Sequence, residues 1–348
     1  MKNHLFITCI IVIALLSSCK TSKNSASNAS NDDLFEKVSR VDDSIQVGGM
    51  VIRNAFKYQL LAHRNGNFDS IVIKDKVFKP NNYCFTTCLS MIFGDANGKK
   101  FMLPGIYDWN RDLFKDHDSL IRAKMAVLDS ININKLFTQH LKAVQEITGH
   151  EGKGSWMVYF GPKDFQIFGG CDDNAMVLDM FGKEWTTSSI NKVFAHELEH
   201  LVYSSVLKND VDKETALAAI IDEGLATYFT YIYLNQTWEE ALDGEYTKLV
   251  TDNEKLIYNT LKPYFMKKGD DACPVLRHTG RSNDCEFVIK IEGMPDDVAN
   301  NLGYYLGFRI IETYVKNHGK DSWKDIYKMP LQQFFKDSGY EEYLISKN

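Results

Sequence analysis

The sequence predicts an α+β fold that is mainly helical. Segments with the length and apolar character of β-strands come first, at 156–162, 165–171 and 175–180. Segments whose apolar residues have helical spacing follow, at 189–207, 214–234, 245–267 and 296–317. Because these strands precede the helices instead of alternating with them, we expect a small antiparallel or mixed sheet and exclude a doubly wound parallel sheet.

Composition and charge are those of an ordinary globular protein. Of the 348 residues, 44% are hydrophobic and 25% are charged, which suits one large domain or two modest ones and excludes disorder, collagen and coiled coil. The formal net charge is -6 at pH 7. An acidic chain of this kind has no long-range positive field, so we expect no nucleic-acid partner.

The chain opens with an apolar run that is too short to span a membrane. Lys2 provides a positive start, and the twelve residues from Leu5 to Leu16 form the run. A helix of this length falls short of the roughly 30 Å hydrocarbon core of a bilayer but suits a signal peptide. The sequence Leu16-Ser17-Ser18-Cys19 resembles the bacterial lipoprotein box, which implies a signal peptide over 1–18 and a lipid on Cys19.

This resemblance also implies a location and a domain order. A lipid on Cys19 would tether the protein to a membrane of the bacterial cell envelope, on the periplasmic side or at the cell surface. Residues 19–33 are polar and are expected to form a flexible tether. The folded part is expected to comprise a mixed N-terminal region at 34–150 and a second domain at 151–348.

The N-terminal region carries mixed signals for secondary structure. Apolar segments at 71–78 and 101–106 have strand-like character, and Asn65-Gly66 and Asn97-Gly98 are turn signals. The sequence therefore predicts short strands and turns before residue 109, and it assigns no role to this region.

Two helices are predicted at the end of the N-terminal region, at 111–129 and 133–148. Apolar residues follow one face of the second helix, and Gly149 provides its stop. His140 lies on the same face. A single histidine among apolar residues is interpreted as a packed core residue and not as a metal ligand.

Five cysteines remain after Cys9 in the signal peptide and the lipidated Cys19 are set aside. Cys273 and Cys285 flank a polar segment, and a disulfide between them is predicted for an oxidising compartment. Cys84 and Cys88 are close enough to pair on a helix but too far apart on a strand. Because the number of remaining cysteines is odd, at least one of them has a free thiol, and we expect this to be Cys171.

The segment at 196–200 carries the residue types of a metal centre. It reads His-Glu-Leu-Glu-His and lies within the predicted helix at 189–207. Residues four apart lie on one face of a helix, so His196 and His200 can ligate a single Zn²⁺. Glu197 lies about 100° round the helix, where its carboxylate can reach the attacking water without binding the metal.

A third ligand is needed, because a catalytic zinc has three protein ligands and one open position. Glu223 is an acid among apolar residues on the next predicted helix, and a short polar loop would fold that helix back against the first. Gly224 would let the two helices approach closely, and Ala226 would keep the site uncrowded. The sequence thus predicts Glu223 as the third ligand.

Together these residues resemble the gluzincin metallopeptidases, in which a Glu on a downstream Glu-Gly-x-Ala helix completes the His-Glu-x-x-His motif. The resemblance covers about residues 155–318 and is strongest with an uncharacterised bacterial domain family of predicted zinc-dependent proteases. It implies a zincin-like fold and one Zn²⁺ held by His196, His200 and Glu223. It also implies that Glu197 is the general base.

The sequence differs from the gluzincin pattern at one position, and it differs from the metzincin pattern at two. Thr227 stands four residues after Glu223, where some gluzincins have an acid, so Asp222 or another acid is left to orient a ligand imidazole. Metzincins are excluded, because Tyr203 and Val206 stand where those enzymes need Gly and His.

A tyrosine on the last long helix is the predicted donor to the reaction's oxyanion. Tyr304, three residues before Gly307, is similar to the Tyr-x-x-Gly element of gluzincin aminopeptidases, in which the phenol has this role. Tyr305 is the alternative. A second interpretation of the same segment is close helix packing at Gly303 and Gly307, with the tyrosines filling the core.

The resemblance leads us to expect a zinc-dependent peptidase of the cell envelope that acts on peptides or proteins. No acidic motif for a free amino terminus is visible, which favours an endopeptidase. The strand at 175–180 is expected to be the sheet edge along which the substrate aligns. The competing hypothesis is a non-catalytic envelope lipoprotein, with an assembly or binding role, that retains the fold.

Overall fold

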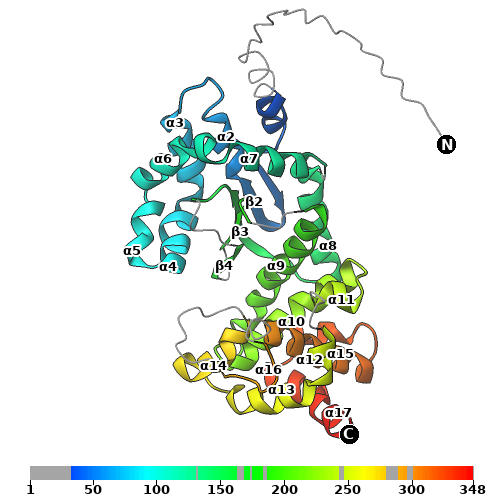
Figure 1. Ribbon diagram of the computed structural model, residues 1–348. Helices are drawn as coiled ribbons and strands as arrows, with labels where there is room; N and C mark the ends of the chain where they lie inside the picture. Colours follow the sequence, from blue (N-terminus) through cyan, green and yellow to red (C-terminus); the bar gives the residue numbers. More distant parts are fainter. Residues whose placement is uncertain are drawn as a thin grey trace, which may run out of the picture.

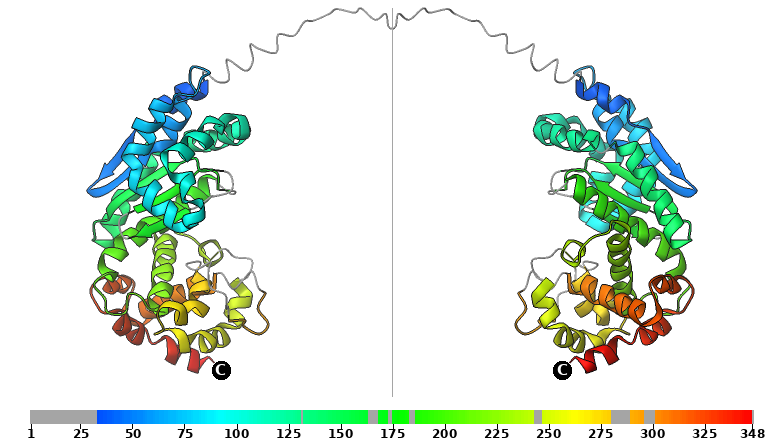
Figure 2. Two further views of the ribbon diagram at one scale, coloured as in Figure 1. Left: turned by 90° about the vertical axis from the view of Figure 1, so that its left-hand side faces the viewer. Right: turned by 90° about the vertical axis from the view of Figure 1, so that its right-hand side faces the viewer.

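The computed structural model describes residues 33–130, 132–162, 168–172, 175–182, 186–242, 247–279, 289–295 and 301–347. The expected signal peptide, Cys19, nearly all of the tether and Cys285 lie outside these residues. Figure 1 shows a lobe built around a β-sheet and a lobe built from helices, with α9 (Thr187–Leu207) leading from one to the other. Figure 2 shows the same two lobes from two sides. In the described part of the chain, no helix is both long and apolar enough to cross a bilayer.

The sheet is mixed, as the sequence predicts. Its described strands are β1 (Ser44–Val47), β2 (Gly49–Asn54), β3 (Lys153–Tyr159), β4 (Phe168–Asp172) and β5 (Ala175–Asp179), in the order β1-β2-β3-β5-β4. β2, β3 and β5 are parallel, whereas β1 and β4 run antiparallel to their neighbours at the two edges. The expected domain boundary at residue 150 therefore falls between two paired strands of one sheet, β2 and β3.

Short helices and two long ones, α7 and α8, form most of the N-terminal region. Residues 33–39 are helical. The elements that follow β2 are α2 (Ala55–Leu61), α3 (Ser70–Val72), η1 (Ile73–Phe78), η2 (Lys79–Asn81), η3 (Cys84–Leu89), α4 (Ser90–Phe93), α5 (Asp95–Gly98), η4 (Lys99–Phe101), α6 (Leu103–Arg111), α7 (Leu113–Ser130) and α8 (Ile133–Thr148).

Both faces of the sheet are buried along the second half of β3, which explains the apolar run from Trp156 to Tyr159. Trp156 and Val158 belong to the core shared with α7, α8 and α9, whereas Met157 and Tyr159 belong to a second core with η1, η3 and α6. Successive side chains of a strand point to opposite faces, so a strand between two helical layers is apolar at every position.

The predicted strands at 71–78 and 101–106 are wrong. The first segment lies in α3 and η1, and the second lies largely in η4 and α6. Ile73 and Val77 are both fully buried and lie four residues apart, so the apolar face follows helical spacing. The turn expected at Asn97-Gly98 is also wrong, because both residues end α5.

The predictions for α8 are confirmed. The helix spans Ile133–Thr148, and Gly149 ends it in the left-handed conformation with φ of 72°. His140 is buried, and its Nε2 lies 3.1 Å from Oδ1 of Asn191. The histidine thus packs in the core and makes a polar contact with α9.

The pairing of the cysteines differs in part from the predicted one. Cys84 is buried and forms no disulfide, whereas Cys88 and Cys273 are each disulfide-bonded. A bond between Cys84 and Cys88 is therefore excluded, although both lie on η3. The side chain of Cys171, our expected free thiol, and the residue Cys285 lie outside what the structure describes.

The strand β5 is not the edge of the sheet. It pairs with β3 on one side and with β4 on the other, so β4 is the edge strand among the strands that the structure describes. The expectation that 175–180 forms the edge is therefore wrong. The reason is that β4 turns back antiparallel beside β5 and occupies the outer position.

The four predicted long helices are present, one of them in pieces. The helical lobe contains α10 (Ala216–Tyr233), α11 (Trp238–Ala241), α12 (Thr247–Asp252), α13 (Glu254–Leu261), η6 (Lys262–Tyr264), η7 (Gly269–Ala272), α14 (Cys273–Leu276), η8 (Arg277–Thr279), α15 (Leu302–His318), η10 (Ser322–Tyr327), α16 (Leu331–Asp337) and α17 (Tyr340–Ser346). The segment predicted as one helix at 245–267 is divided into α12, α13 and η6.

Two polar caps start the helices that carry the functional motifs. At α9, the hydroxyl of Thr186 accepts from the N–H of Ser189 at 3.1 Å, and the Ser189 hydroxyl accepts from the N–H of Thr186 at 2.7 Å. At α10, the hydroxyl of Thr215 accepts from the N–H of Ala218 at 3.2 Å. These bonds satisfy backbone donors that have no partner inside the helix.

α10 and α15 cross in backbone contact at two glycines. A Cβ atom added to Gly307 would lie 2.8 Å from Cα of Gly224 and would overlap the carbonyl oxygen of Ile220. A Cβ atom on Gly224 would overlap the backbone of Gly307 in the same way. The crossing therefore requires glycine on both helices. Gly224 thus packs against α15 and not, as expected, against α9, whereas close helix packing at Gly307, the second interpretation of that segment, is confirmed.

We expect Gly307→Ala to lower the free energy of unfolding by about 2 kcal/mol or more, because the added methyl group overpacks a contact between two backbones. Gly98→Ala is the matched control, since a Cβ atom there would make only ordinary contacts, at 3.5 Å from Ser90. Urea unfolding of the two variants measures the difference, and equal stability would contradict the crossing.

Candidate metal centre

Three side chains from two helices converge on one point. His196 and His200 lie on α9, and Glu223 lies on α10. The Nε2 atoms of the two histidines are 3.1 Å apart, and Oε2 of Glu223 lies 3.3 Å from Nε2 of His196 and 3.2 Å from that of His200. The three atoms therefore form a nearly equilateral triangle.

The size of this triangle fits a tetrahedral zinc ion. Donor atoms placed about 2.0–2.1 Å from one ion in a tetrahedron lie about 3.3–3.4 Å from one another. The observed edges of 3.1–3.3 Å agree with this value to within about 0.2 Å. Two imidazoles and one carboxylate are also donors that zinc prefers, and three ligands leave a fourth position open.

Asp222 orients one of the histidines. Its Oδ1 lies 2.9 Å from Nδ1 of His200, so Nδ1 donates to the carboxylate and Nε2 is left to face Glu223. Burial by itself would lower the pKa of His200, but the charges of Asp222 and Glu223 outweigh burial and hold that pKa well above its usual value. The two carboxylates thus stabilise positive charge at His200, whether a proton or a metal supplies it.

A second carboxylate lies behind Asp222. Glu199 is fully buried, and its Oε1 accepts a hydrogen bond from the Tyr327 hydroxyl at 2.7 Å. Its Oε2 has no hydrogen-bond partner among the described residues. Burial raises the pKa of Glu199 to about 8, and the nearby charge of Asp222 adds to the shift. Glu199 is therefore expected to be largely protonated at pH 7, which avoids a third negative charge beside the ligands.

Glu197 lies beside the three converging side chains without belonging to the triangle. One of its carboxylate oxygens lies within 4.8 Å of a ring nitrogen of both His196 and His200. Glu197 also lines a cavity of about 240 Å³ together with His196 and Tyr304. Its carboxylate is thus accessible from the side on which a ligand can enter.

The two neighbouring tyrosines of α15 have different surroundings. The ring of Tyr304 stacks on that of His196, with centroids 5.9 Å apart and an interplanar angle of 24°. Tyr305 is buried, and its hydroxyl donates to Oγ1 of Thr251 at 3.3 Å. Of these two tyrosines, Tyr304 is the one that lies against a residue of the candidate metal centre. This position favours Tyr304 over Tyr305 as the expected donor to the oxyanion.

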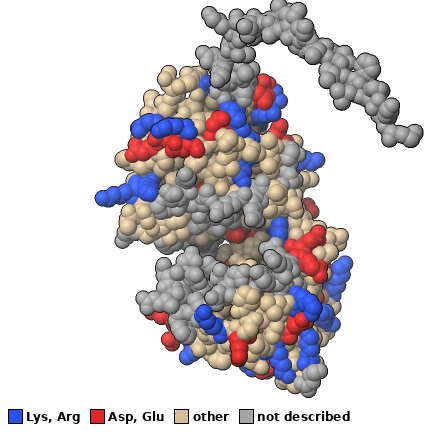
Figure 3. Space-filling model, in the orientation of Figure 1, with Lys and Arg blue, Asp and Glu red and all other residues tan. Residues whose placement is uncertain are grey.

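The centre lies where the two lobes meet. α9 leads out of the sheet lobe, whereas α10 and α15 belong to the helical lobe (Figure 1). Figure 3 shows that the molecular surface is hollowed between the lobes. The cavity beside the centre is lined by residues of α9, of α10, of the end of α11 and of the start of α15.

The sequence predicts the candidate metal ligands but not all of the residues that surround and orient them. Glu199 stands inside the His-Glu-Leu-Glu-His motif, and its apolar surroundings are the only local signal that it is buried. Tyr327 lies more than 120 residues further along the chain. No spacing rule connects it to α9, so only the tertiary structure identifies this partner.

The helix pair brings two histidines and one glutamate together, an arrangement that resembles the ligand set of gluzincin-type proteins. The chain belongs to the family described as predicted Zn-dependent protease (DUF2268), which matches residues 162–336. This match covers α9, α10, α15 and all of the residues of the centre. No curated protein and no solved structure matches the chain.

We expect Asp222→Asn to weaken zinc binding about 10–100-fold, since the amide keeps a hydrogen bond to His200 but removes the negative charge. Asp108→Asn is the matched control, because Asp108 is 74% exposed and lies on α6. Competition with a chromogenic chelator measures both affinities. An Asp222→Asn protein that binds zinc as tightly as the control would show that Asp222 does not support the metal.

Proposed function

We propose that the protein is a zinc-dependent peptidase in which His196, His200 and Glu223 hold one Zn²⁺. The observation that carries this proposal is the triangle of donor atoms, whose edges match the spacing around a tetrahedral zinc. The family description, predicted Zn-dependent protease, supports the same metal and the same class of reaction.

Glu197 and Tyr304 then lie where each can take part in the reaction. Zinc would supply Lewis acidity for the scissile carbonyl and would make water acidic enough to ionise near neutral pH. Glu197 takes the proton from the attacking water and passes it to the leaving amine. The phenol of Tyr304 donates to the oxyanion that develops on the carbonyl oxygen.

The edge strand β4 is the proposed place for the backbone of the substrate. An extended peptide can add to an exposed edge strand through main-chain hydrogen bonds. Among the described strands, β4 is the last of the sheet and pairs with β5 on one side. In Figure 1, β4 is drawn on the side of the sheet that is nearer the helical lobe. Alignment along a strand favours an internal peptide bond, and hence an endopeptidase.

We expect Glu197→Gln to lower kcat by about 10²–10⁴-fold while zinc binding is unchanged, because the amide cannot accept the proton of water. Glu146→Gln, at an exposed position of α8, is the matched control. Cleavage of a fluorogenic peptide library and the metal content of each protein are the measurements. Stoichiometric zinc without cleavage of any peptide by the unmodified protein would favour a non-catalytic binding or assembly role.

We further propose that the protein is anchored by lipid in the bacterial cell envelope. The disulfides at Cys88 and Cys273 support this location, since such bonds persist in oxidising compartments. Expression in bacteria with radiolabelled palmitate should label the unmodified protein in the membrane fraction. The variant Cys19→Ser should take up no label, and an unlabelled wild-type protein would exclude the anchor.

A further inference from the structure

The cavity beside Glu197 has the size of a single amino-acid side chain. Its volume is about 240 Å³. Thr227 and Thr230 line it from α10, and Ala241 and Leu242 line it from the end of α11. An apolar cavity of about 150 Å³ holds a benzene molecule, so this one has room for one large side chain but not for a drug-sized ligand.

Apart from His196, Glu197, Asn301 and Tyr304, the polar residues that line the cavity are bonded to the protein itself. The hydroxyls of Thr227 and Thr230 donate to carbonyls one turn earlier in α10, both at 2.8 Å. Nζ of Lys192 donates to the carbonyl of Glu240 at 2.7 Å. A polar side chain that entered the cavity would lose water and find few free partners, whereas an apolar one would gain from burial.

The wall formed by α11 is held in place from a distance. Nε1 of Trp238, at the start of α11, donates to Oε1 of Glu312 at 3.1 Å. The guanidinium of Arg309 lies over the same indole, 4.7 Å from its centroid, and pairs with Glu312. Both residues lie on α15, which also carries Tyr304. The wall formed by α11 and the part of the lining formed by Tyr304 are therefore both held by α15.

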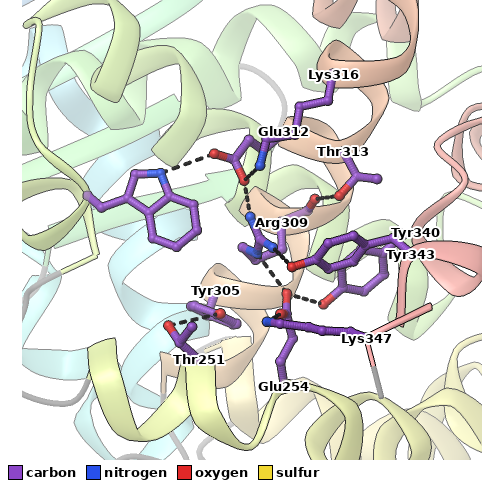
Figure 4. Close-up of polar contacts among 11 residues, drawn as sticks. Thr251, Glu254, Tyr305, Arg309, Glu312, Thr313, Lys316, Tyr340, Tyr343 and Lys347 are labelled. Carbon is purple, nitrogen blue, oxygen red and sulfur yellow. Dashed lines mark hydrogen bonds and ion pairs between the residues drawn. The ribbon is translucent and has the colours of Figure 1, made fainter. Parts of the chain in front are cut away.

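A buried ion-pair network anchors Arg309 in turn (Figure 4). Its Nε donates to Oε1 of Glu254 at 2.7 Å, and another guanidinium nitrogen donates to the Tyr343 hydroxyl at 2.7 Å. Burial would raise the pKa of Glu254, but the bond and charge of Arg309, with the bonds from Lys347 and Tyr340, outweigh burial and lower that pKa. An ionised, fully paired network of this kind holds α11 rigidly, so the width of the cavity is set in advance.

We infer that this cavity is the specificity pocket of the enzyme and binds one large apolar side chain, such as Phe, Leu or Met, next to the scissile bond. Ala241 and Leu242 set its width. This inference rests on the proposed peptidase activity for the position of the side chain relative to the cleaved bond. The evidence for the pocket itself is the set of residues that line it, so the pocket can be tested by binding alone.

The first test compares cleavage of a peptide library by the full-length protein and by Ala241→Phe. The unmodified enzyme should prefer large apolar residues at one position beside the cleaved bond. In Ala241→Phe the added ring fills the cavity, so the preference for Phe over Ala at that position should fall by at least about tenfold in kcat/KM. Ala123→Phe, at an exposed position of α7, should keep the original preference.

A second variant changes the pocket in the opposite direction and does not risk overpacking. Leu242→Ala widens the cavity, so the preference should move towards Trp at the same position by about tenfold. Leu256→Ala is the matched control, because Leu256 is 43% exposed on α13. Unchanged preferences in both Ala241→Phe and Leu242→Ala, in enzymes that still cleave peptides, would overturn the inference.

Binding without catalysis separates this inference from the proposed function. The probe is N-acetyl-L-phenylalaninamide, titrated by calorimetry into Glu197→Gln and into the double variant with Ala241→Phe. Binding that weakens at least about tenfold in the double variant supports the pocket, even if no peptide is ever cleaved. Equal binding by both proteins, or binding by neither, overturns it.

Discussion

The backbone contact between α10 and α15 is the constraint on which the candidate site depends. Gly224 and Gly307 bring the two helices so close that no side chain fits between them. Glu223 directly precedes the first glycine, and Tyr304 lies one turn before the second. A single crossing therefore fixes a metal ligand on one helix and an aromatic ring on the other. The same helix, α15, holds α11 through Arg309, so one packing contact determines the metal centre and the adjoining cavity together.

Electrostatics explains why the centre is suited to a cation. Asp222 and Glu223 are adjacent acids in a nearly buried setting, and both lie against His200. Two negative charges in such a place are costly unless positive charge balances them. Glu199 lies behind them, and its raised pKa keeps it from adding to the negative charge at neutral pH. The arrangement therefore stabilises one divalent cation or a protonated histidine, and the spacing of the donor atoms selects the metal.

Prediction from the sequence succeeded where local spacing decides the outcome. The helix of α8, the strand β3 and the helices α9, α10 and α15 all follow from apolar periodicity and from stop signals. It failed at 71–78, where Ile73 and Val77 are one helical turn apart but a mixed apolar segment also suits a strand. It also failed at β5, because the sequence shows that a strand exists but not which strands become its neighbours. Sheet order depends on long-range pairing that no local pattern encodes.

The sequence by itself determined which side chains of α9 share the candidate centre. Helical geometry places His196 and His200 on one face with Glu197 beside them, and this follows from residue spacing alone. The tertiary structure decided which other residues support the centre. Tyr304 lies against His196 whereas Tyr305 turns towards Thr251, and the supporting bond of Tyr327 comes from a distant segment. Contacts within one helix are fixed by its 3.6-residue period, but contacts between helices depend on how the whole chain packs.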